Sequence, residues 1–233
     1  MASFTQTDHF VRVQGHKLDI SIIEPSGKSK GSALFLHGGG ETSTKQLHLP
    51  LAKALAQLGY KGLVFSYPGH GKSTGKIVGS SLSKRVTIAK ELAIKLGFFP
   101  GTLLCASSMG AHIALRLAGD NFHKLALFVP AVYAAEAEDV PFGAPFSEIL
   151  RKPESYKNSL ALESLRVYEG KLIIFQAGRD KIIPPEAIDL IWKKAVSVES
   201  KDKVVFDDSP HGISDWIYQS EDRLTSVVKA LKK

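Results

Sequence analysis

Two adjacent serines, Ser107 and Ser108, lie where a short apolar run gives way to an alanine-rich helical pattern. A serine nucleophile at a sharp strand-to-helix turn requires small residues two positions before it and two positions after it. Ser108 has Ala106 and Gly110 at these positions, whereas the corresponding neighbours of Ser107 are a cysteine and a methionine. The pattern predicts Ser108 as a nucleophile, although an ordinary turn with a serine N-cap is an equally good interpretation of this stretch alone.

A serine hydroxyl is a weak nucleophile until a nearby base takes its proton, and histidine is the usual base because it titrates near neutral pH. A carboxylate then holds the histidine in the correct tautomer. Asp180 follows a predicted strand over 172–175, and His211 follows a predicted strand over 203–206. Asp180 alone would suit an ordinary turn, but the chain order Ser108, Asp180, His211 predicts a catalytic triad.

Other residues could compete for these roles, and the sequence argues against each of them. Asp207 and Asp208 lie only a few residues before His211, so we expect them on a loop or at the surface. His112 should be packed rather than catalytic, and Cys105 should point into the core as a small apolar residue. The other histidines are expected to brace loops, at His37 and His70, or to be surface or loop residues, at His9, His16, His48 and His123.

The elements that must position these residues alternate between strands and helices after an opening hairpin, which is predicted over 10–13 and 18–23. Short, continuous apolar runs predict buried strands over 33–36, 61–66, 101–106, 124–129, 172–175 and 203–206. Apolar residues at helical spacing predict helices over 45–58, 83–96, 109–118, 186–194 and 213–231. This order predicts an α/β fold with a mostly parallel central sheet, an N-terminal antiparallel hairpin and helices on both faces.

Four parts of the chain together resemble the α/β-hydrolase superfamily of serine hydrolases, which includes esterases, lipases and S33-type peptidases. They are the sequence His-Gly-Gly-Gly at 37–40, the segment 66–73, the turn around Ser108, and the two loops that carry Asp180 and His211. The segment 66–73 differs from the family's pattern at its first position, where Ser66 replaces an aspartate.

The resemblance implies the α/β-hydrolase fold and an oxyanion hole formed by the backbone N–H groups of Gly39 and Met109. It also implies that hydrolysis needs no metal and no cofactor. In this superfamily the insertion after the sixth strand often sets substrate choice. Here that insertion is 131–170, where short helices are predicted over 146–151 and 158–167, and its length predicts a short cap rather than a full lid domain. Its aromatic residues could line an acyl pocket or form the cap's own small core.

Composition excludes several classes of protein. The 233 residues are 44% hydrophobic and 23% charged, which predicts one globular domain over 1–233 with the cap-like insertion within it. The net charge is +7, but the lysines are scattered and lack interleaved aromatic residues, so we expect no nucleic-acid partner. A single cysteine, a polar N-terminus and the lack of a long apolar run predict a cytoplasmic protein without stable membrane insertion.

The sequence does not predict nucleotide binding, because the run Gly69 to Thr74 lacks the first glycine of a phosphate-binding loop. The expected reaction is transfer of an acyl group from a small-molecule substrate to Ser108 and then to water, with a carboxylic ester as the leading substrate. A thioester, a small amide or peptide, or transfer to another acceptor would use the same groups. A non-catalytic binding protein of the same fold is the competing class, and its usual sign would be a missing triad member.

Overall fold

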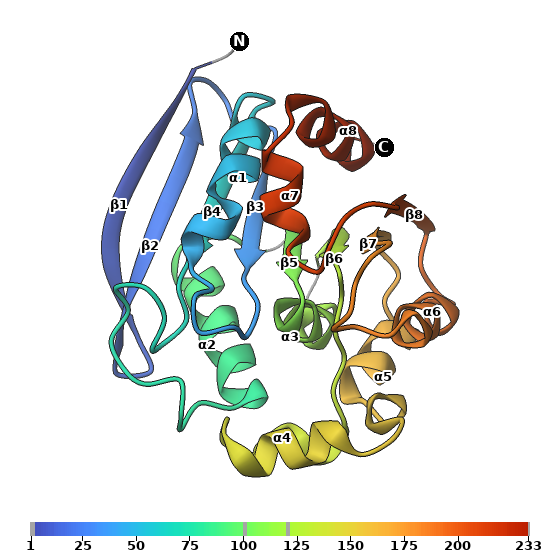
Figure 1. The fold of residues 1–233 in the computed structure, drawn as a ribbon. Helices are drawn as coiled ribbons and strands as arrows, with labels where there is room; N and C mark the ends of the chain where they lie inside the picture. The colour runs from blue at the N-terminus through green and yellow to red at the C-terminus, as the bar shows by residue number, and fades with distance from the viewer. Residues whose placement is uncertain (1–2, 100–101, 120–121, 233) are drawn as a thin grey trace.

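The computed structural model describes residues 3–99, 102–119 and 122–232, and within these ranges eight strands form one sheet (Figure 1). The strand order is β1-β2-β4-β3-β5-β6-β7-β8, and only the pairs β1–β2 and β2–β4 are antiparallel. The strands are Phe4–Val13, His16–Pro25, Gly31–Leu36, Tyr60–Phe65, Leu103–Ser107, Lys124–Phe128, Lys171–Ala177 and Ser200–Phe206. The predicted α/β-hydrolase fold with its N-terminal hairpin is confirmed, and residue 101 of the predicted strand 101–106 lies outside the described residues.

Helices cover both faces of the sheet because the central strands are buried on both sides. One face packs against α1 (Leu49–Ala56), α7 (Ile213–Tyr218) and α8 (Glu221–Leu231). The other packs against α2 (Leu82–Lys95), α3 (Met109–Leu117), α5 (Leu160–Arg166) and α6 (Pro185–Lys194). None of the helices in the described ranges has the length and hydropathy needed to cross a membrane.

Two predicted helices and the predicted hairpin differ from the structure. The helix expected over 45–58 is a 3-10 turn, η1 (Lys45–His48), followed by α1, which has a proline in its first turn. The helix expected over 213–231 is divided into α7 and α8, because the Ser220 side chain caps a new helix by accepting from the Arg223 N–H. The hairpin strands are ten residues each, joined at Gln14 and Gly15, which both have positive φ as a tight hairpin turn requires.

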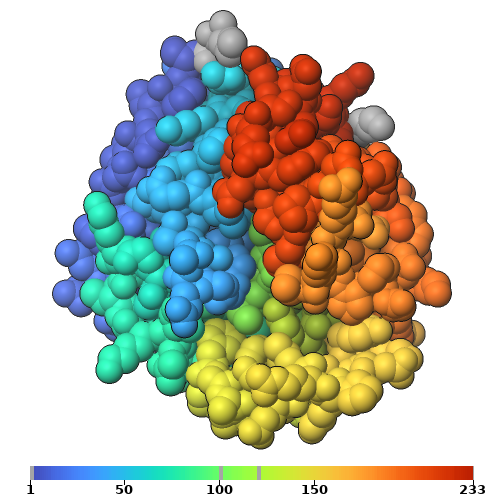
Figure 2. Space-filling view, viewed as in Figure 1, coloured from blue at the N-terminus to red at the C-terminus, as the bar shows by residue number. Residues whose placement is uncertain are grey.

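The insertion 131–170 forms η2 (Ala135–Ala137), α4 (Ala144–Arg151), η3 (Ser155–Lys157) and α5. The Phe146 ring packs on those of Tyr133 and Phe142, with ring centroids 5.7 and 4.9 Å apart. Phe142 and Phe146 are buried within the same core as α2 and α3, so these aromatic side chains pack the insertion onto the main core of the domain. In Figure 2 the insertion, in yellow, lies along the lower edge of a hollow between the blue and the red-orange segments.

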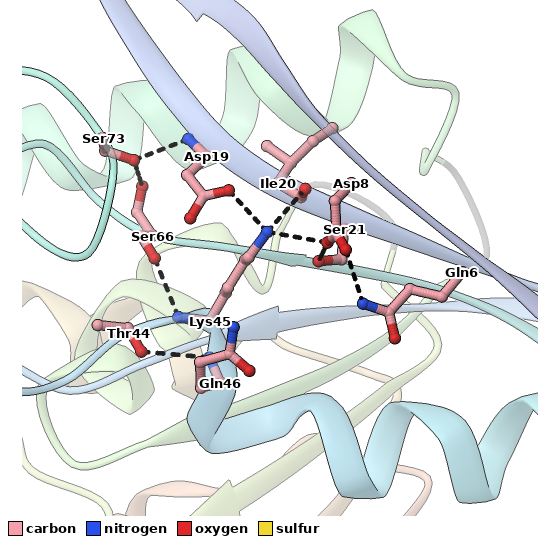
Figure 3. A network of polar contacts seen from close by, with 10 residues as sticks. All are labelled: Gln6, Asp8, Asp19, Ile20, Ser21, Thr44, Lys45, Gln46, Ser66 and Ser73. Atoms are coloured by element: carbon pink, nitrogen blue, oxygen red, sulfur yellow. Dashed lines mark hydrogen bonds and ion pairs between the residues drawn. The ribbon is translucent and has the colours of Figure 1, made fainter.

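A buried lysine ties the hairpin to the loop that follows β3 (Figure 3). The Lys45 ammonium lies 2.6 Å from Asp19 Oδ1 and 3.0 Å from Asp8 Oδ1, and it donates to the Ile20 carbonyl. The Lys45 backbone N–H donates to Ser66 Oγ over 3.0 Å. Ser66, which replaces the family's aspartate, therefore accepts a backbone hydrogen bond that fixes the end of the loop.

Candidate active site

Ser108 lies at a strained turn between β5 and α3. Its φ of 52° and ψ of −120° lie outside the regions that non-glycine residues favour. Its backbone N–H donates to the Phe128 carbonyl over 2.9 Å, and its carbonyl accepts from the Ala131 N–H over 3.2 Å. Bonds to the end of β6 thus hold the strained conformation in place, as expected for a sharp strand-to-helix turn that exposes its serine.

The residues on either side of Ser108 are small for different physical reasons. A Cβ atom on Gly110 would lie 2.3 Å from the Leu36 carbonyl oxygen, so this position accepts only glycine. Ala106 is fully buried in the core beneath α2 and α3, and its methyl group is accommodated there. Ser107 is also buried, and its hydroxyl has no hydrogen-bond partner among the described residues.

The structure brings Ser108, His211 and Asp180 together in one chain of hydrogen bonds. His211 Nε2 lies 3.2 Å from Ser108 Oγ, and His211 Nδ1 lies 2.9 Å from Asp180 Oδ2. The second carboxylate oxygen, Asp180 Oδ1, accepts the backbone N–H groups of Ile182 and Ile183 over 2.8 and 3.0 Å. Both oxygens of Asp180 are occupied, so the loop fixes the carboxylate and the carboxylate in turn fixes the imidazole.

The loops after β7 and β8 can approach one another because of a glycine. A Cβ atom on Gly178 would lie 2.3 Å from the Asp207 carbonyl oxygen. Asp207 and Asp208 are exposed, and Asp208 forms a salt bridge with Arg179 at the surface. Neither competes with Asp180 for His211, which agrees with their predicted surface location.

The glycine loop after β3 lies directly against the serine turn. A Cβ atom on Gly38 would lie 3.3 Å from Ser108 Cβ, and one on Gly39 would lie 2.6 Å from the Met109 Cε atom. At Gly38 the serine turn would have to give by a few tenths of an ångström to accept a Cβ atom, whereas at Gly39 the flexible Met109 side chain would have to move. The loop and the first turn of α3 therefore place the backbone of Gly39 and Met109, the two predicted oxyanion donors, beside each other at Ser108.

An open cleft of about 500 Å³ leads to Ser108. One wall is the loop after β3 with η1, and the other is the segment from His211 to Asp215. No lysine or arginine is among its described lining residues, and Asp215 is the one carboxylate there. The cleft is therefore small, nearly neutral and lined mostly by glycine, serine and threonine. The described residues contain no cluster of side chains that could hold a metal ion.

Four other histidines and Cys105 have structural roles. His37 and His70 brace loops, as predicted, and burial lowers the pKa of each, that of His70 to about 4. His112 is packed, as predicted, with Nε2 3.0 Å from Glu138, and Cys105 is buried. The prediction for His48 was wrong: it is buried against Phe35, with Nε2 3.2 Å from the Leu36 carbonyl.

Two residues close to the site were not predicted from the sequence. Lys45 supports the loop after β3, and Arg85 on α2 reaches the Gly38 carbonyl with its Nη1 atom at 3.2 Å. Arg85 does carry a signal, because it occupies a position of the buried helix stripe that also holds Leu82 and Leu92. A charged residue within an apolar stripe indicates a buried polar contact. Lys45 has no comparable signal.

The eight-stranded sheet, the strained serine turn and the loops at the carboxyl ends of β5, β7 and β8 define an α/β-hydrolase. The chain belongs, more specifically, to the hydrolase family described as serine aminopeptidase, S33, whose model matches residues 27–164. This match includes Gly39, Ser108 and Met109 but ends before Asp180 and His211. No curated protein sequence gives a significant match.

Solved structures agree on the fold at low sequence identity. Est1E from Butyrivibrio proteoclasticus, solved with ferulic acid, has a TM-score of 0.72 and 16% identity over 97% of this chain and 100% of its own. The esterase EaEST from Exiguobacterium antarcticum has a TM-score of 0.72 and 18% identity with the same coverage. A predicted CIB-like hydrolase from Thermoplasma acidophilum has a TM-score of 0.71 and 15% identity over 98% and 99%. At such identities the similarity establishes the shared fold.

Proposed function

We propose that this protein is a serine hydrolase that cleaves a carboxylic ester through an acyl-enzyme on Ser108. The observation that carries the proposal is the hydrogen-bonded chain from Ser108 Oγ through His211 to Asp180, located at the base of an open cleft. Membership of a hydrolase family and the likeness to solved esterases support the same reading. No residue that the reaction requires is missing from the chain.

The hydrogen-bond geometry supports the proton positions that this reaction needs. Because Asp180 accepts from His211 Nδ1–H, Nε2 is left free to accept the Ser108 hydroxyl proton. Ser108 Oγ then attacks the ester carbon, and the negative charge on the carbonyl oxygen is received by the backbone N–H groups of Gly39 and Met109. His211 gives its proton to the leaving alcohol. Water repeats the sequence on the acyl-enzyme, with His211 again acting as base, and releases the acid.

The cleft favours small, uncharged esters. Leu47, Val129 and Ile213 are the larger apolar residues among its described lining, and the aromatic residues of the insertion are committed to a packed core. A long acyl chain would find little apolar surface to cover it. We therefore expect acetyl and butyryl esters to be turned over in preference to decanoyl esters.

Turnover of p-nitrophenyl esters of increasing chain length tests this proposal, with thioesters and aminoacyl amides measured in parallel. We expect kcat/KM for the acetyl and butyryl esters to exceed that for the decanoyl ester by about tenfold or more. Ser108→Ala and His211→Ala should each lower turnover by about 10⁴-fold or more, and Asp180→Asn by about 10⁴-fold. Turnover that survives Ser108→Ala, or a marked preference for aminoacyl amides, would contradict the proposal.

A further inference from the structure

Arg85 is a buried cation that has no anionic partner within the described part of the chain. Its side chain is fully buried, and in the described residues no carboxylate forms a salt bridge with it. Instead the guanidinium lies between the Tyr67 and Phe142 rings, 4.7 and 4.9 Å from their centroids. Burial lowers the pKa of Arg85 to about 10, so the group stays charged at neutral pH. An uncompensated buried charge is costly, so its contacts should matter.

These contacts converge on the glycine loop. Arg85 Nη1 donates to the Gly38 carbonyl over 3.2 Å and lies 3.6 Å from the Met109 sulfur. Arg85 Nη2 donates to His70 Nε2 over 2.6 Å. One guanidinium therefore touches the loop after β3, the first residue of α3 and a histidine that itself supports the loop.

The hydrogen bonds assign the tautomers of two neighbouring histidines. His70 Nε2 accepts from Arg85, so its proton is on Nδ1, which donates to the Ser43 carbonyl over 2.9 Å. His37 Nε2 accepts the Tyr67 backbone N–H over 3.0 Å, so its Nδ1 donates to the Gly38 carbonyl over 2.8 Å. The Gly38 carbonyl is thus held by two donors, one of them a cation, and the far end of the loop is held at Ser43.

The Gly38 carbonyl and the Gly39 N–H belong to one planar trans peptide group, so they point in opposite directions. Fixing the carbonyl toward Arg85 fixes the N–H on the other side. We propose that Arg85 is a positioning residue of the oxyanion hole, which orients the Gly38–Gly39 peptide so that the Gly39 N–H faces the carbonyl oxygen of a substrate bound at Ser108. This inference rests on the proposed serine-hydrolase function.

The role makes a specific kinetic prediction. The negative charge on the substrate oxygen develops in the transition state, so a misoriented Gly39 N–H should slow the chemical step and leave ground-state binding unchanged. Arg85→Met keeps much of the side chain's volume but removes the charge and the donors. Arg85→Lys restores the charge and one donor. Lys84→Met is the matched control, because Lys84 is the adjacent cation on the same helix and is exposed to solvent.

The experiment measures kcat and KM on p-nitrophenyl acetate, normalised to active sites titrated with a fluorophosphonate, together with Ki for phenylboronic acid, which forms a tetrahedral adduct with a reactive serine. For Arg85→Met we expect kcat per active site to fall about 100-fold, KM to change less than about threefold, and boronate affinity to fall with kcat. The kcat of Arg85→Lys should be about tenfold higher than that of Arg85→Met. Lys84→Met should match the wild type.

The proposed function and the role of Arg85 are contradicted by different results. If the wild type neither turns over esters nor reacts with the fluorophosphonate, the proposed function is wrong. If the wild type is active but Arg85→Met loses titratable sites while the remaining sites keep the wild-type kcat, Arg85 acts on stability alone and the inference is wrong. A rise in KM without a fall in kcat would also overturn it, because Arg85 would then bind substrate. Should Arg85→Met not fold, wild-type boronate affinity in Arg85→Lys would overturn the inference, and weakened affinity at unchanged KM would support it.

Discussion

Replacing Lys45 tests how the N-terminal hairpin is joined to the glycine loop. The Lys45 and Asp19 side chains are only 5% and 10% exposed, and they lie 2.6 Å apart. Lys45→Met leaves the Asp19 carboxylate buried without a cation, which should cost about 3–5 kcal/mol of the free energy of unfolding. Asp19→Asn should cost less, about 1–2 kcal/mol, because Lys45 keeps Asp8 and the Ile20 carbonyl as partners.

The double variant, Lys45→Met with Asp19→Asn, separates the interaction energy of this pair from the energy of each residue's other contacts. It removes the stranded carboxylate, so its cost should be smaller than the sum of the two single variants by about 2 kcal/mol. Urea unfolding followed by tryptophan fluorescence gives each free energy. Asp8→Asn is the control, because the Asp8 side chain is 55% exposed and its salt bridge should contribute less than about 1 kcal/mol. A cost below about 1 kcal/mol for Lys45→Met, or additive costs within about 0.5 kcal/mol, would contradict an energetic coupling between Lys45 and Asp19.

Ser107→Ala should leave ester turnover within about tenfold of the wild type, and a loss comparable to Ser108→Ala would show that the wrong serine was chosen. Gly110→Ala should lower the free energy of unfolding by about 3 kcal/mol or more, because its Cβ would lie 2.3 Å from the Leu36 carbonyl oxygen; unchanged urea unfolding would contradict this. Burial lowers the pKa of His48 from its ordinary 6.5 to about 4, so the folded state resists protonation and loses stability as pH falls through this window. The loss should reach about 3 kcal/mol relative to His48→Gln, and parallel stability curves for the two proteins would disprove it.

The sequence predicted the central fold well because its signals are local. The buried parallel strands are short continuous apolar runs, and the catalytic candidates follow them at once. β1 was predicted too short because its outer half, around Thr5 and Asp8, is polar and is held as a strand by pairing with β2. The division between α7 and α8 had a local signal in Ser220, followed by two acidic residues, and a capping rule applied there would have found it.

The residues that support the site were harder to predict than the candidate triad. Ser108, Asp180 and His211 each have a motif or a position after a strand, whereas Lys45 and Arg85 act through tertiary contacts with segments distant in sequence. The prediction for His48 was wrong for the same reason, since its burial depends on the end of β3. Periodicity indicates that a residue lies on a buried face, and it does not indicate which carbonyl or carboxylate that residue will meet.

If Ser108 is an activated nucleophile, a serine-reactive probe should form a covalent bond with it. The protein is incubated with a fluorophosphonate probe, and the adduct is counted by intact mass and located by peptide mass spectrometry. We expect one adduct per chain on Ser108, no adduct on Ser108→Ala, and undiminished labelling of Ser107→Ala. Absence of labelling in the folded wild type, or equal labelling of Ser108→Ala, would contradict this expectation.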